Sequence, residues 1–446
     1  MNTPKKLATP EQAAMQVKSK DTLAWGHVNG KPIDFDKALA NRKDELEEII
    51  IFAGCTLPPL PEILAKDPKS ETFIYHNVYF SPVDRMFNTQ GTQYYLPMNY
   101  SDGAHSFGLI CSPDITVVQV APMDDNGFFN YGPQPSYSDI IVKAARQVIV
   151  EVNNTMPRVM GATGSCVHIS DVDFIIEGTN TPLFGAPAPT TFTEEDKKIA
   201  SYVVNAMHDG VCLQLGIGEL PTLIGQIISN SDLKDLGVHS EMFVEPYIDI
   251  FESGKATGKY KTTDPGKMAY TFTIGSPDCY AWLHDNPAAI AYSSDYICSP
   301  EIIALNDNMF SVNSCVEIDL FTQVCSESTG YRQISGSGGQ LDFIVGTFRS
   351  KGGKSLICTP STFTTKKGEL KSRIVPTVSP GGTVTTPRTY VDYVVTENGM
   401  VQMRSKSTWQ RAEALISIAH PEFHDSLIRE ADKMGIWRKS NKSDAK

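Results

Sequence analysis

Short apolar runs rich in valine and isoleucine alternate along this chain with amphipathic stretches. Four of these runs have the length of a buried strand: 115–120, 148–152, 212–215 and 343–345. Continuous apolar runs between turn residues are typical of strands covered on both faces, as in parallel sheets flanked by helices. The pattern therefore predicts an α/β fold with mainly parallel sheets.

Amphipathic spacing predicts helices over 10–19, 194–207, 221–228 and 408–418. Two of them have a recognisable start, because Thr9 precedes Pro10 and Thr193 precedes the acidic turn 194–196. A threonine oxygen at this position accepts a backbone N–H bond that the helix otherwise leaves unpaired. Acidic side chains in the first turn interact favourably with the positive end of the helix dipole and so stabilise the helix.

The length of the chain predicts two domains, since 446 residues exceed what one hydrophobic core normally serves. The segment 180–192 is too rich in proline for a strand or a helix and is our candidate linker. We expect an N-terminal domain over 1–185, a C-terminal domain over 193–438 and a frayed tail at 439–446. Each half places a strand, a glycine turn and a helix in similar order, which hints at internal duplication without any residue-level repeat.

Charge and cysteine usage narrow the function. A formal charge of −12 without a stripe of lysine and arginine argues against nucleic-acid binding. The nine cysteines are dispersed and never form CxxC, which favours buried thiols in a reducing cytosol and argues against a metal site. The N-terminus is short and polar, and no apolar run reaches about 18 residues. We therefore expect a cytoplasmic protein without a membrane partner.

A Gly-Ile-Gly turn at Gly216, Ile217 and Gly218 follows the apolar run 212–215 and precedes a helix opened by Pro221. Such a turn exposes backbone N–H groups and the positive end of a helix, so it can hold an oxyanion or an anionic ligand. Position 221 is proline where a dinucleotide fingerprint needs glycine, which excludes that motif. An ordinary strand-to-helix turn remains the alternative.

A second glycine-rich loop spans 334–343 and contains Gly336, Gly338 and Gly339. It lacks the Gly-Lys-Ser/Thr ending of a phosphate loop, which argues against nucleotide triphosphates. Its glycines allow the backbone to approach a bulky ligand and to point an amide into a site. The alternative is a plain surface loop.

Glu241 lies between these two glycine-rich segments and is our candidate nucleophile. A carboxylate nucleophile forms an anhydride or thioester that keeps its group-transfer potential, whereas a serine ester is too stable to pass an acyl group onward easily. Acyl transfer therefore suits this arrangement better than hydride or phosphoryl chemistry. The alternative for Glu241 is an exposed loop residue, and for the neighbouring His239 a structural role.

Several strings stand together in this chain: Leu-Gly-Ile-Gly-x-x-Pro at 215–221, His-Ser-Glu-Met at 239–242, Ser-Gly-x-Gly-Gly-Gln-Leu-Asp-Phe at 335–343, Asp-Tyr-Val-Val-Thr-Glu-Asn-Gly at 392–399, and Arg-Ala through Ala-His-Pro between 411 and 421. Shorter ones are Asp-Asp-Asn-Gly-Phe at 124–128 and Glu-Val-Asn at 151–153. As a set they resemble the acetyl-CoA hydrolase/transferase family, and within it the 4-hydroxybutyrate and butyryl-CoA:acetate CoA-transferases. The resemblance is strong from about 117 to 423 and weaker before it.

The resemblance implies two CoA-transferase-type α/β domains with the active site between them. It implies that Glu241 attacks an acyl-CoA, that backbone amides at Ile217, Gly218, Gly338 and Gly339 form the oxyanion hole, and that coenzyme A moves by a ping-pong route through a glutamyl-CoA thioester. It implies no metal and no permanent cofactor, with coenzyme A as a substrate. Candidate contacts for coenzyme A are Gly216, Gly336, Gln340, Lys351 and Lys354, with Arg373 as a further cation for its phosphates.

The carboxylate pocket is expected on the N-terminal side, where aromatic and polar residues alternate. Its candidates are His27, Asn77, Tyr79 and Tyr94, together with His239; core packing is the alternative for each. The function expected is transfer of coenzyme A between short-chain acids such as butyrate, 4-hydroxybutyrate and acetate. An acyl-CoA hydrolase using the same glutamate and a non-catalytic CoA-binding module are the alternatives. The family resemblance also implies a homodimer or tetramer.

Overall fold

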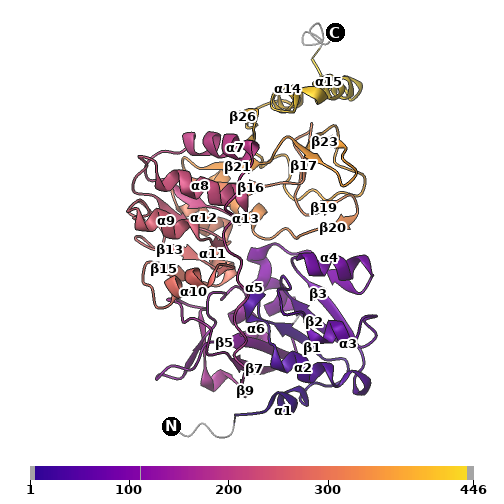
Figure 1. Cartoon of the computed structure of the whole chain (residues 1–446), viewed down its shortest axis with the longest axis vertical. Coiled ribbons are helices and arrows are strands. Elements are labelled where there is room, and N and C mark those ends of the chain that lie inside the picture. Colours follow the sequence, from indigo (N-terminus) through magenta and orange to yellow (C-terminus); the bar gives the residue numbers. More distant parts are fainter. Residues whose placement is uncertain (1–5, 111, 439–446) are drawn as a thin grey trace.

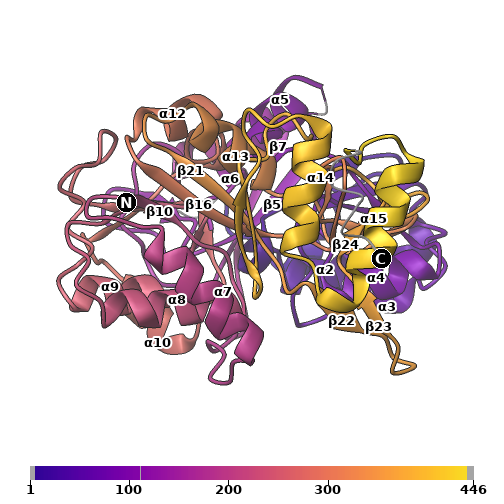
Figure 2. The ribbon, with the colours of Figure 1, turned by 90° about the horizontal axis from the view of Figure 1, so that it is seen from above.

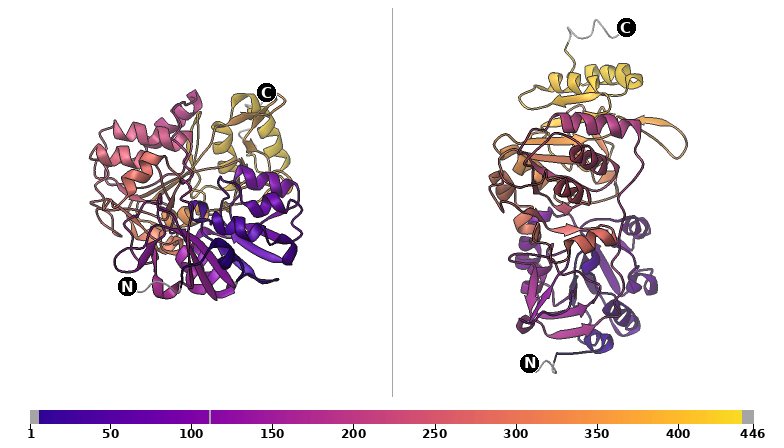
Figure 3. Two further views of the ribbon diagram at one scale, coloured as in Figure 1. Left: turned by 60° about the horizontal axis from the view of Figure 1, so that its bottom comes forward. Right: turned by 60° about the vertical axis from the view of Figure 1, so that its left-hand side comes forward.

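Two large parallel sheets organise the chain, one in each half of the sequence. The computed structural model describes residues 6–110 and 112–438, so the tail predicted at 439–446 lies outside the described residues. The N-terminal half occupies one end of the long axis and the C-terminal half the other (Figure 1). Figure 3 shows the same stacking from two further sides. The predicted α/β class with mainly parallel sheets is confirmed.

The first sheet has the order β4-β3-β2-β1-β5-β7-β9, and all of its described strands run parallel. Its strands are β1 (Thr22–Trp25), β2 (Ile49–Ala53), β3 (Phe73–Asn77), β4 (Gln93–Tyr95), β5 (Ile115–Val120), β7 (Gln147–Val152) and β9 (Phe174–Glu177). Every residue of β5 is buried, as the continuous apolar run predicts.

Helices on one face of this sheet bury their apolar residues against it. They are α1 (Pro10–Ala14), α2 (Asp34–Ala40), α3 (Glu62–Lys66) and α4 (Pro82–Thr89). The other face shares a core with the C-terminal half, because Val118 and Val150 belong to the same apolar cluster as Phe272, Ile297 and Phe343. The remaining N-terminal elements are α5 (Gly103–His105), α6 (Ser138–Ala144), β6 (Phe128–Asn130) and β8 (Cys166–His168). The two halves are thus joined by a common core.

The second sheet has the order β15-β13-β11-β10-β16-β21-β25-β26, with only the edge strand β26 antiparallel among its described members. Its strands are β10 (Cys212–Gln214), β11 (Gly237–His239), β13 (Met268–Tyr270), β15 (Ala289–Ala291), β16 (Met309–Ser314), β21 (Lys354–Cys358), β25 (Tyr393–Thr396) and β26 (Gly399–Gln402). The helices before and between these strands are α7 (Glu194–Asn205), α8 (Glu219–Ser229), α9 (Pro246–Glu252), α10 (Pro277–Leu283), α11 (Ser294–Ile297), α12 (Pro300–Leu305) and α13 (Gln340–Arg349).

A smaller core lies at the C-terminal end, where α14 (Thr408–Ser417) and α15 (His424–Lys433) cover the short sheet β18-β17-β24 and part of β25. Figure 2 looks down on these two helices. The short strands of this half are β12 (Met242–Phe243), β14 (Phe272–Thr273), β17 (Glu317–Asp319), β18 (Val324–Cys325), β19 (Ser328–Thr329), β20 (Arg332–Gln333), β22 (Thr362–Thr364), β23 (Leu370–Ser372) and β24 (Ile374–Val375).

The two large sheets share one strand order. Taken in chain order within each sheet, the fourth, third, second and first strands lie side by side, followed by the fifth, sixth and seventh. The first four strands of each sheet are therefore added toward one edge, and the later strands are added toward the other edge. The strand order reverses between β1 and β5 in one sheet and between β10 and β16 in the other. Crevices at the carboxyl ends of such strand pairs are the usual ligand sites of open α/β sheets.

The two expected helix N-caps, Thr9 and Thr193, are confirmed. The hydroxyl of Thr9 accepts the N–H of Gln12 at 3.2 Å, and that of Thr193 accepts the N–H of Asp196 at 3.1 Å. Helix α1 ends at Ala14, earlier than expected, because Gln16 and Val17 turn back to the carbonyls of residues three positions before them. Helix α8 begins at Glu219, two residues before Pro221.

The strand predicted at 343–345 is wrong, because these residues lie inside helix α13. Phe343, Ile344 and Thr347 form its buried side, which is helical spacing. An apolar run of three residues is too short for its period to be recognised. The candidate linker contains neither helix nor strand, since residues 178–193 are irregular. Within 6–110 and 112–438, no helix has the length and apolar character needed to cross a bilayer.

Candidate active site

A cavity of about 530 Å³ lies between the two halves, where the carboxyl ends of β1, β10 and β16 meet. From the N-terminal half it is lined by His27, Cys55, Val78, Tyr79, Met98 and Tyr100. From the C-terminal half its walls include Gln214 to Pro221, Glu241, Met242, Phe272, Asn313 to Cys315, Ser335 to Gln340, Thr359 and Arg373. The crossing points of both sheets thus open into one space, which is where their topology predicts a ligand.

Glu241 follows strand β11 by two residues, and its backbone is fixed on both sides. Its carbonyl accepts the N–H groups of Thr271 at 3.1 Å and Phe272 at 3.3 Å. The preceding Ser240 is fully buried, and its hydroxyl accepts a hydrogen bond from the Tyr247 hydroxyl at 3.1 Å. The main chain of Glu241 therefore has little freedom, while its side chain lines the cavity.

The Glu241 carboxylate meets the glycine-rich loop at the start of α13. The backbone N–H of Gly339 donates to Oε2 of Glu241 at 3.1 Å. A Cβ on Gly339 would lie 2.5 Å from the same oxygen, so only glycine permits this approach. Gly338, with φ of 52°, occupies the left-handed region that glycine adopts without strain. The Gly339 amide is therefore positioned to bind negative charge beside the Glu241 carboxylate.

Burial raises the pKa of Glu241 to about 8, and the nearby carboxylate of Asp342 adds to the rise, while the Gly339 N–H offsets part of it. Asp342 is itself held by Ser101, whose N–H and hydroxyl donate to it at 3.0 and 2.7 Å. Burial raises the pKa of Asp342 to about 7. A raised pKa means that desolvation opposes the charge on Glu241, which makes the carboxylate a stronger nucleophile once it is deprotonated.

The Gly-Ile-Gly turn faces the same cavity from the end of β10. Gly218, with φ of 116°, is the N-cap of the eleven-residue helix α8. A Cβ on Gly216 or Gly218 would meet no atom within 4 Å, so both backbones border open space. The Gly339 amide at the start of α13 and the backbone of Gly216 and Gly218 before α8 therefore approach the cavity from two directions.

A segment of the N-terminal half holds the glycine-rich loop in place. The Tyr100 N–H donates to the Gly338 carbonyl at 3.1 Å, and the Ser337 hydroxyl donates to the Met98 carbonyl at 2.6 Å. The Ser337 N–H donates to the Tyr95 hydroxyl at 3.2 Å. Because Met98 and Tyr100 also line the cavity, the two halves build this site jointly.

His27 contributes a neutral ring to the N-terminal wall. Burial lowers its pKa to about 3, so it is uncharged at neutral pH. Its Nδ1 lies 3.1 Å from the Tyr100 hydroxyl, and its ring packs edge-on against Phe272 with centroids 4.8 Å apart. Tyr79, another predicted pocket residue, also lines the cavity.

Five predicted site residues are not among the residues that line this cavity: Asn77, Tyr94, His239, Lys351 and Lys354. Asn77 is fully buried, and its side-chain oxygen Oδ1 accepts the N–H groups of Cys55 at 2.8 Å and Tyr79 at 3.1 Å, so it positions two wall residues from behind. The Tyr94 hydroxyl donates to the Gly91 carbonyl at 3.2 Å.

The other three also have local partners. His239 is fully buried with Nε2 2.9 Å from the Ile297 carbonyl, which is its alternative structural role. Lys351 is exposed and pairs with Asp307 at 3.7 Å. Lys354 donates to the Ala206 carbonyl at 3.0 Å. Arg373, by contrast, does line the cavity.

Several lining residues were not predicted from the sequence, among them Cys55, Tyr100, Gln214, Asn313 and Thr359. Gln214 ends β10, Asn313 is the last but one residue of the adjacent parallel strand β16, and Thr359 directly follows β21, the next strand. Polar residues at the carboxyl ends of neighbouring strands were the available signal. Among the residues that the structure describes, no group of three or more His, Cys, Asp or Glu is arranged to hold a metal ion.

Comparison with known proteins identifies the family of this chain. The model of the acetyl-CoA hydrolase/transferase N-terminal domain matches residues 2–184, and that of the C-terminal domain matches residues 275–431. The butyryl-CoA:acetate CoA-transferase of Anaerostipes caccae is 44% identical over 439 residues, which cover 98% of each chain. The chain belongs to the acetyl-CoA hydrolase/transferase family.

Two further relatives span the same length. The 4-hydroxybutyrate coenzyme A transferase of Clostridium kluyveri is 37% identical over 433 residues, which cover 96% of this chain and 97% of that protein. The crystal structure of RipA from Yersinia pestis superimposes with a TM-score of 0.89 at 35% identity, covering 97% of this chain and 98% of that one. The likeness to this family thus includes the N-terminal half, which the motifs alone reached only in part.

Proposed function

We propose that this chain is an acyl-CoA:carboxylate CoA-transferase for short-chain acids, with Glu241 as its nucleophile. The observation that carries the proposal is the contact between Glu241 and the Gly339 amide inside a cavity bordered by both sheets. Relatives at high identity are named for butyryl-CoA, acetate and 4-hydroxybutyrate, which supports acids of that size.

The reaction begins when a Glu241 oxygen attacks the thioester carbonyl carbon. The carbonyl oxygen becomes an oxyanion that the amides of Gly339 and Gly218 can stabilise, and the C–S bond breaks to give an acyl-glutamyl anhydride and the CoA thiolate. The thiolate then attacks the glutamyl carbonyl and displaces the first acid as its carboxylate. The product is a glutamyl-CoA thioester.

The second half repeats these steps in reverse with another acid. Its carboxylate attacks the glutamyl thioester, CoA thiolate leaves, and the thiolate then attacks the new acyl carbonyl to release acyl-CoA and free Glu241. Each stage exchanges one activated acyl bond for another. The nucleotide part of coenzyme A is distant from the reacting bond, and its binding energy can be used to close the site and desolvate the carboxylate.

We propose that Arg373 provides the positive charge for coenzyme A. It is the one lysine or arginine among the described residues that line the cavity. Its guanidinium donates to the Val316 carbonyl at 2.9 Å and lies 5.0 Å from the Phe363 ring centre, and no carboxylate within residues 6–110 and 112–438 forms an ion pair with it. Gly216, Gly336 and Gln340 border the same space and suit the pantetheine arm.

The acyl group is proposed to enter the N-terminal wall. His27, Tyr79, Met98 and Tyr100 give this wall apolar and neutral polar surface, which fits a short aliphatic chain better than a second carboxylate. Burial raises the pKa of Tyr79 and of Tyr100 well above the usual tyrosine value, so both stay neutral. Asn77 supports this wall through Cys55 and Tyr79.

One assay tests the function. The chain is incubated with butyryl-CoA, with and without acetate, while free thiol and acetyl-CoA are followed. Acetyl-CoA formed only with acetate is the expected result. Thiol release independent of acetate would instead identify a hydrolase, and neither product would contradict both enzymes. The expected homodimer or tetramer and the cytoplasmic location stay predictions, the first of which light scattering on the purified chain would test.

A further inference from the structure

Two loops on the acyl side of the cavity contain non-glycine residues in the left-handed region. The first-strand loop, residues 26–31, contains Val28 with φ of 44°, and the second-strand loop, residues 54–59, contains Cys55 with φ of 49°. This conformation is strained for a β-branched residue and persists only where the surroundings impose it. His27 and Cys55 both line the cavity. The contacts that impose the strain therefore also shape the acyl wall.

The two loops are tied together at two points. Near the cavity, the Val28 N–H donates to the Gly54 carbonyl at 3.2 Å, and a Cβ on Gly54 would lie only 2.4 Å from Cδ2 of His27. Farther from the cavity, the Lys31 ammonium donates to the Pro59 carbonyl at 2.7 Å. The Lys31 side chain thus connects the last residue of the first-strand loop to the last residue of the second-strand loop.

The Lys31 ammonium is buried, with 5% of the residue exposed. Burial lowers its pKa to about 8, although the charges of Asp36 and Glu151 offset part of the effect. A buried ammonium is unfavourable unless its hydrogen bonds are well placed. An apolar residue could fill the same space without a buried charge. We therefore attribute the lysine to the hydrogen bond between its ammonium and the Pro59 carbonyl.

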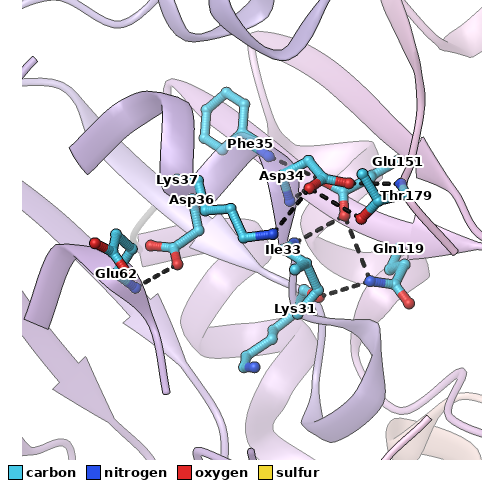
Figure 4. Close-up of polar contacts among 10 residues, drawn as sticks. All are labelled: Lys31, Ile33, Asp34, Phe35, Asp36, Lys37, Glu62, Gln119, Glu151 and Thr179. Atoms are coloured by element: carbon cyan, nitrogen blue, oxygen red, sulfur yellow. Dashed lines mark hydrogen bonds and ion pairs between the residues drawn. The ribbon is translucent and has the colours of Figure 1, made fainter. Parts of the chain in front are cut away.

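The two carboxylates near Lys31 are engaged elsewhere (Figure 4). Glu151 accepts the N–H groups of Ile33, Asp34 and Phe35 at 2.8, 3.0 and 2.9 Å, at the start of α2. Asp36 accepts the N–H groups of Glu62 and Ile63 at 2.6 and 3.3 Å, at the start of α3. In Figure 4 the Lys31 ammonium points away from Glu151.

Each carboxylate thus fixes the helix that follows one loop. Glu151 holds α2 behind the first-strand loop, and Asp36 holds α3 behind the second-strand loop. The Lys31 ammonium then fixes the spacing between the loops themselves.

We infer that Lys31 is a positioning residue that sets how wide the acyl end of the cavity can open. The inference rests on the proposed function and names the residue that limits the acyl chain it accepts. Without the ammonium, the first-strand loop and the second-strand loop can separate, and the wall formed by His27 and Cys55 relaxes. Longer acyl chains then gain access, while the chemistry at Glu241 is unchanged because that carboxylate is held by the other half.

The test compares Lys31→Met with Lys37→Met, a control that removes an exposed lysine of α2 hydrogen-bonded to Asp34 at 3.2 Å. Transfer from acetyl-, butyryl- and hexanoyl-CoA is measured for the full chain and both variants. For Lys31→Met we expect the ratio of kcat/KM for hexanoyl-CoA over acetyl-CoA to rise about tenfold. The Lys37→Met variant should keep the ratio of the unaltered chain.

A second measurement does not depend on turnover. Dissociation constants for the same three acyl-CoAs are determined by calorimetry in the Glu241→Gln background, with and without Lys31→Met. The same change in chain-length preference is expected. If Lys31→Met alone does not fold, Lys31→Met combined with Asp36→Asn removes the Lys31 charge together with one of its two neighbouring carboxylates, and should show the same preference.

Equal losses for all three acyl-CoAs, or an unchanged ratio, would overturn the inference. Absence of transfer by the unaltered chain would instead contradict the proposed function, and the binding ratios would still decide the role of Lys31.

Discussion

The two large sheets share their strand order, yet they place opposite kinds of surface at their crossing points. In the N-terminal half, the loops after the first two strands are tightly packed, since a Cβ on Gly26 would lie 2.3 Å from the backbone carbonyl oxygen of Gly30 and one on Gly54 would lie 2.4 Å from the His27 ring. In the C-terminal half, the turn after the first strand is open, with no atom within 4 Å of a Cβ on Gly216 or Gly218.

The loops after the second strand differ in the same way. Strand β2 is followed by Cys55 and strand β11 by Glu241, and both side chains line the one cavity. One half thus contributes a closed wall of neutral side chains, and the other contributes a carboxylate beside a backbone amide. Both halves share one strand order, so under the proposed function the loop residues decide which half binds the acyl group and which half reacts.

The largest expected effect is on the reacting half. Glu241→Gln removes the nucleophile but keeps the size of the side chain, so transfer between butyryl-CoA and acetate should fall by about 10³-fold or more. Cys55→Ala changes the residue that follows the second strand of the other half and should alter the rate by less than about fivefold. Steady-state kinetics measures both. Comparable losses would remove the division of labour between the halves.

The next effect concerns the amide beside the carboxylate. Gly339→Ala places a Cβ 2.5 Å from Oε2 of Glu241 and should lower kcat by about 10²- to 10³-fold, the cost of one misplaced oxyanion donor. Gly108→Ala, at a position outside the cavity lining where a Cβ meets no atom within 4 Å, is the control and should retain most activity. Circular dichroism verifies that both variants fold. An active Gly339→Ala enzyme would contradict the role of this amide.

A smaller effect is expected from pH. Because the pKa of Glu241 is raised to about 8, the carboxylate is the minor form in the empty site at neutral pH. We expect kcat/KM to rise with pH, by up to about tenfold per unit, and to level off above about pH 8. Asp342→Asn removes the neighbouring like charge, so its profile should shift to lower pH. A profile that is flat from pH 6 to 9 would count against a protonated resting Glu241.

The smallest effect is expected in the recognising half. His27→Leu replaces a neutral, buried ring, so we expect the preference between butyryl-CoA and acetyl-CoA to change by about tenfold or less. The amount of covalent intermediate formed should stay the same. Competition between the two acyl-CoAs in one reaction measures the preference. Loss of the intermediate itself would assign His27 to the chemistry.

The strand pattern and the glycine spacing were enough to predict the architecture and part of the site. The buried run 115–120 forms β5, which pairs with β1, and the run 212–215 contains β10, which pairs with β16. Each of these strand pairs lies where the strand order of its sheet reverses. Gly218, Gly338 and Gly339 were accessible to the same reasoning because their predicted chemistry depends on the backbone, and Glu241 because it lies between the two glycine-rich segments. Their roles in catalysis stay predictions until the kinetics are measured.

Side chains that depend on tertiary contacts were not predictable in this way. Asn77 and Tyr94 lie on neighbouring parallel strands, yet one is buried behind the wall and the other is exposed. Lys354 has the charge to bind a phosphate, but its ammonium reaches a helix carbonyl, while Arg373 lies at the cavity. The direction of a side chain at a strand end is set by packing against elements far away in sequence, and a local pattern does not contain it.

A covalent glutamyl-CoA thioester on Glu241 would be direct evidence that this residue is the nucleophile. The chain is mixed with butyryl-CoA in the absence of an acceptor acid, treated with borohydride to reduce any thioester, digested and analysed by mass spectrometry. Reduction of the side chain at Glu241, dependent on butyryl-CoA and lost in the Glu241→Gln variant, is the predicted result. An adduct on another residue such as Cys55, or full transfer activity without any modification of Glu241, would contradict the account.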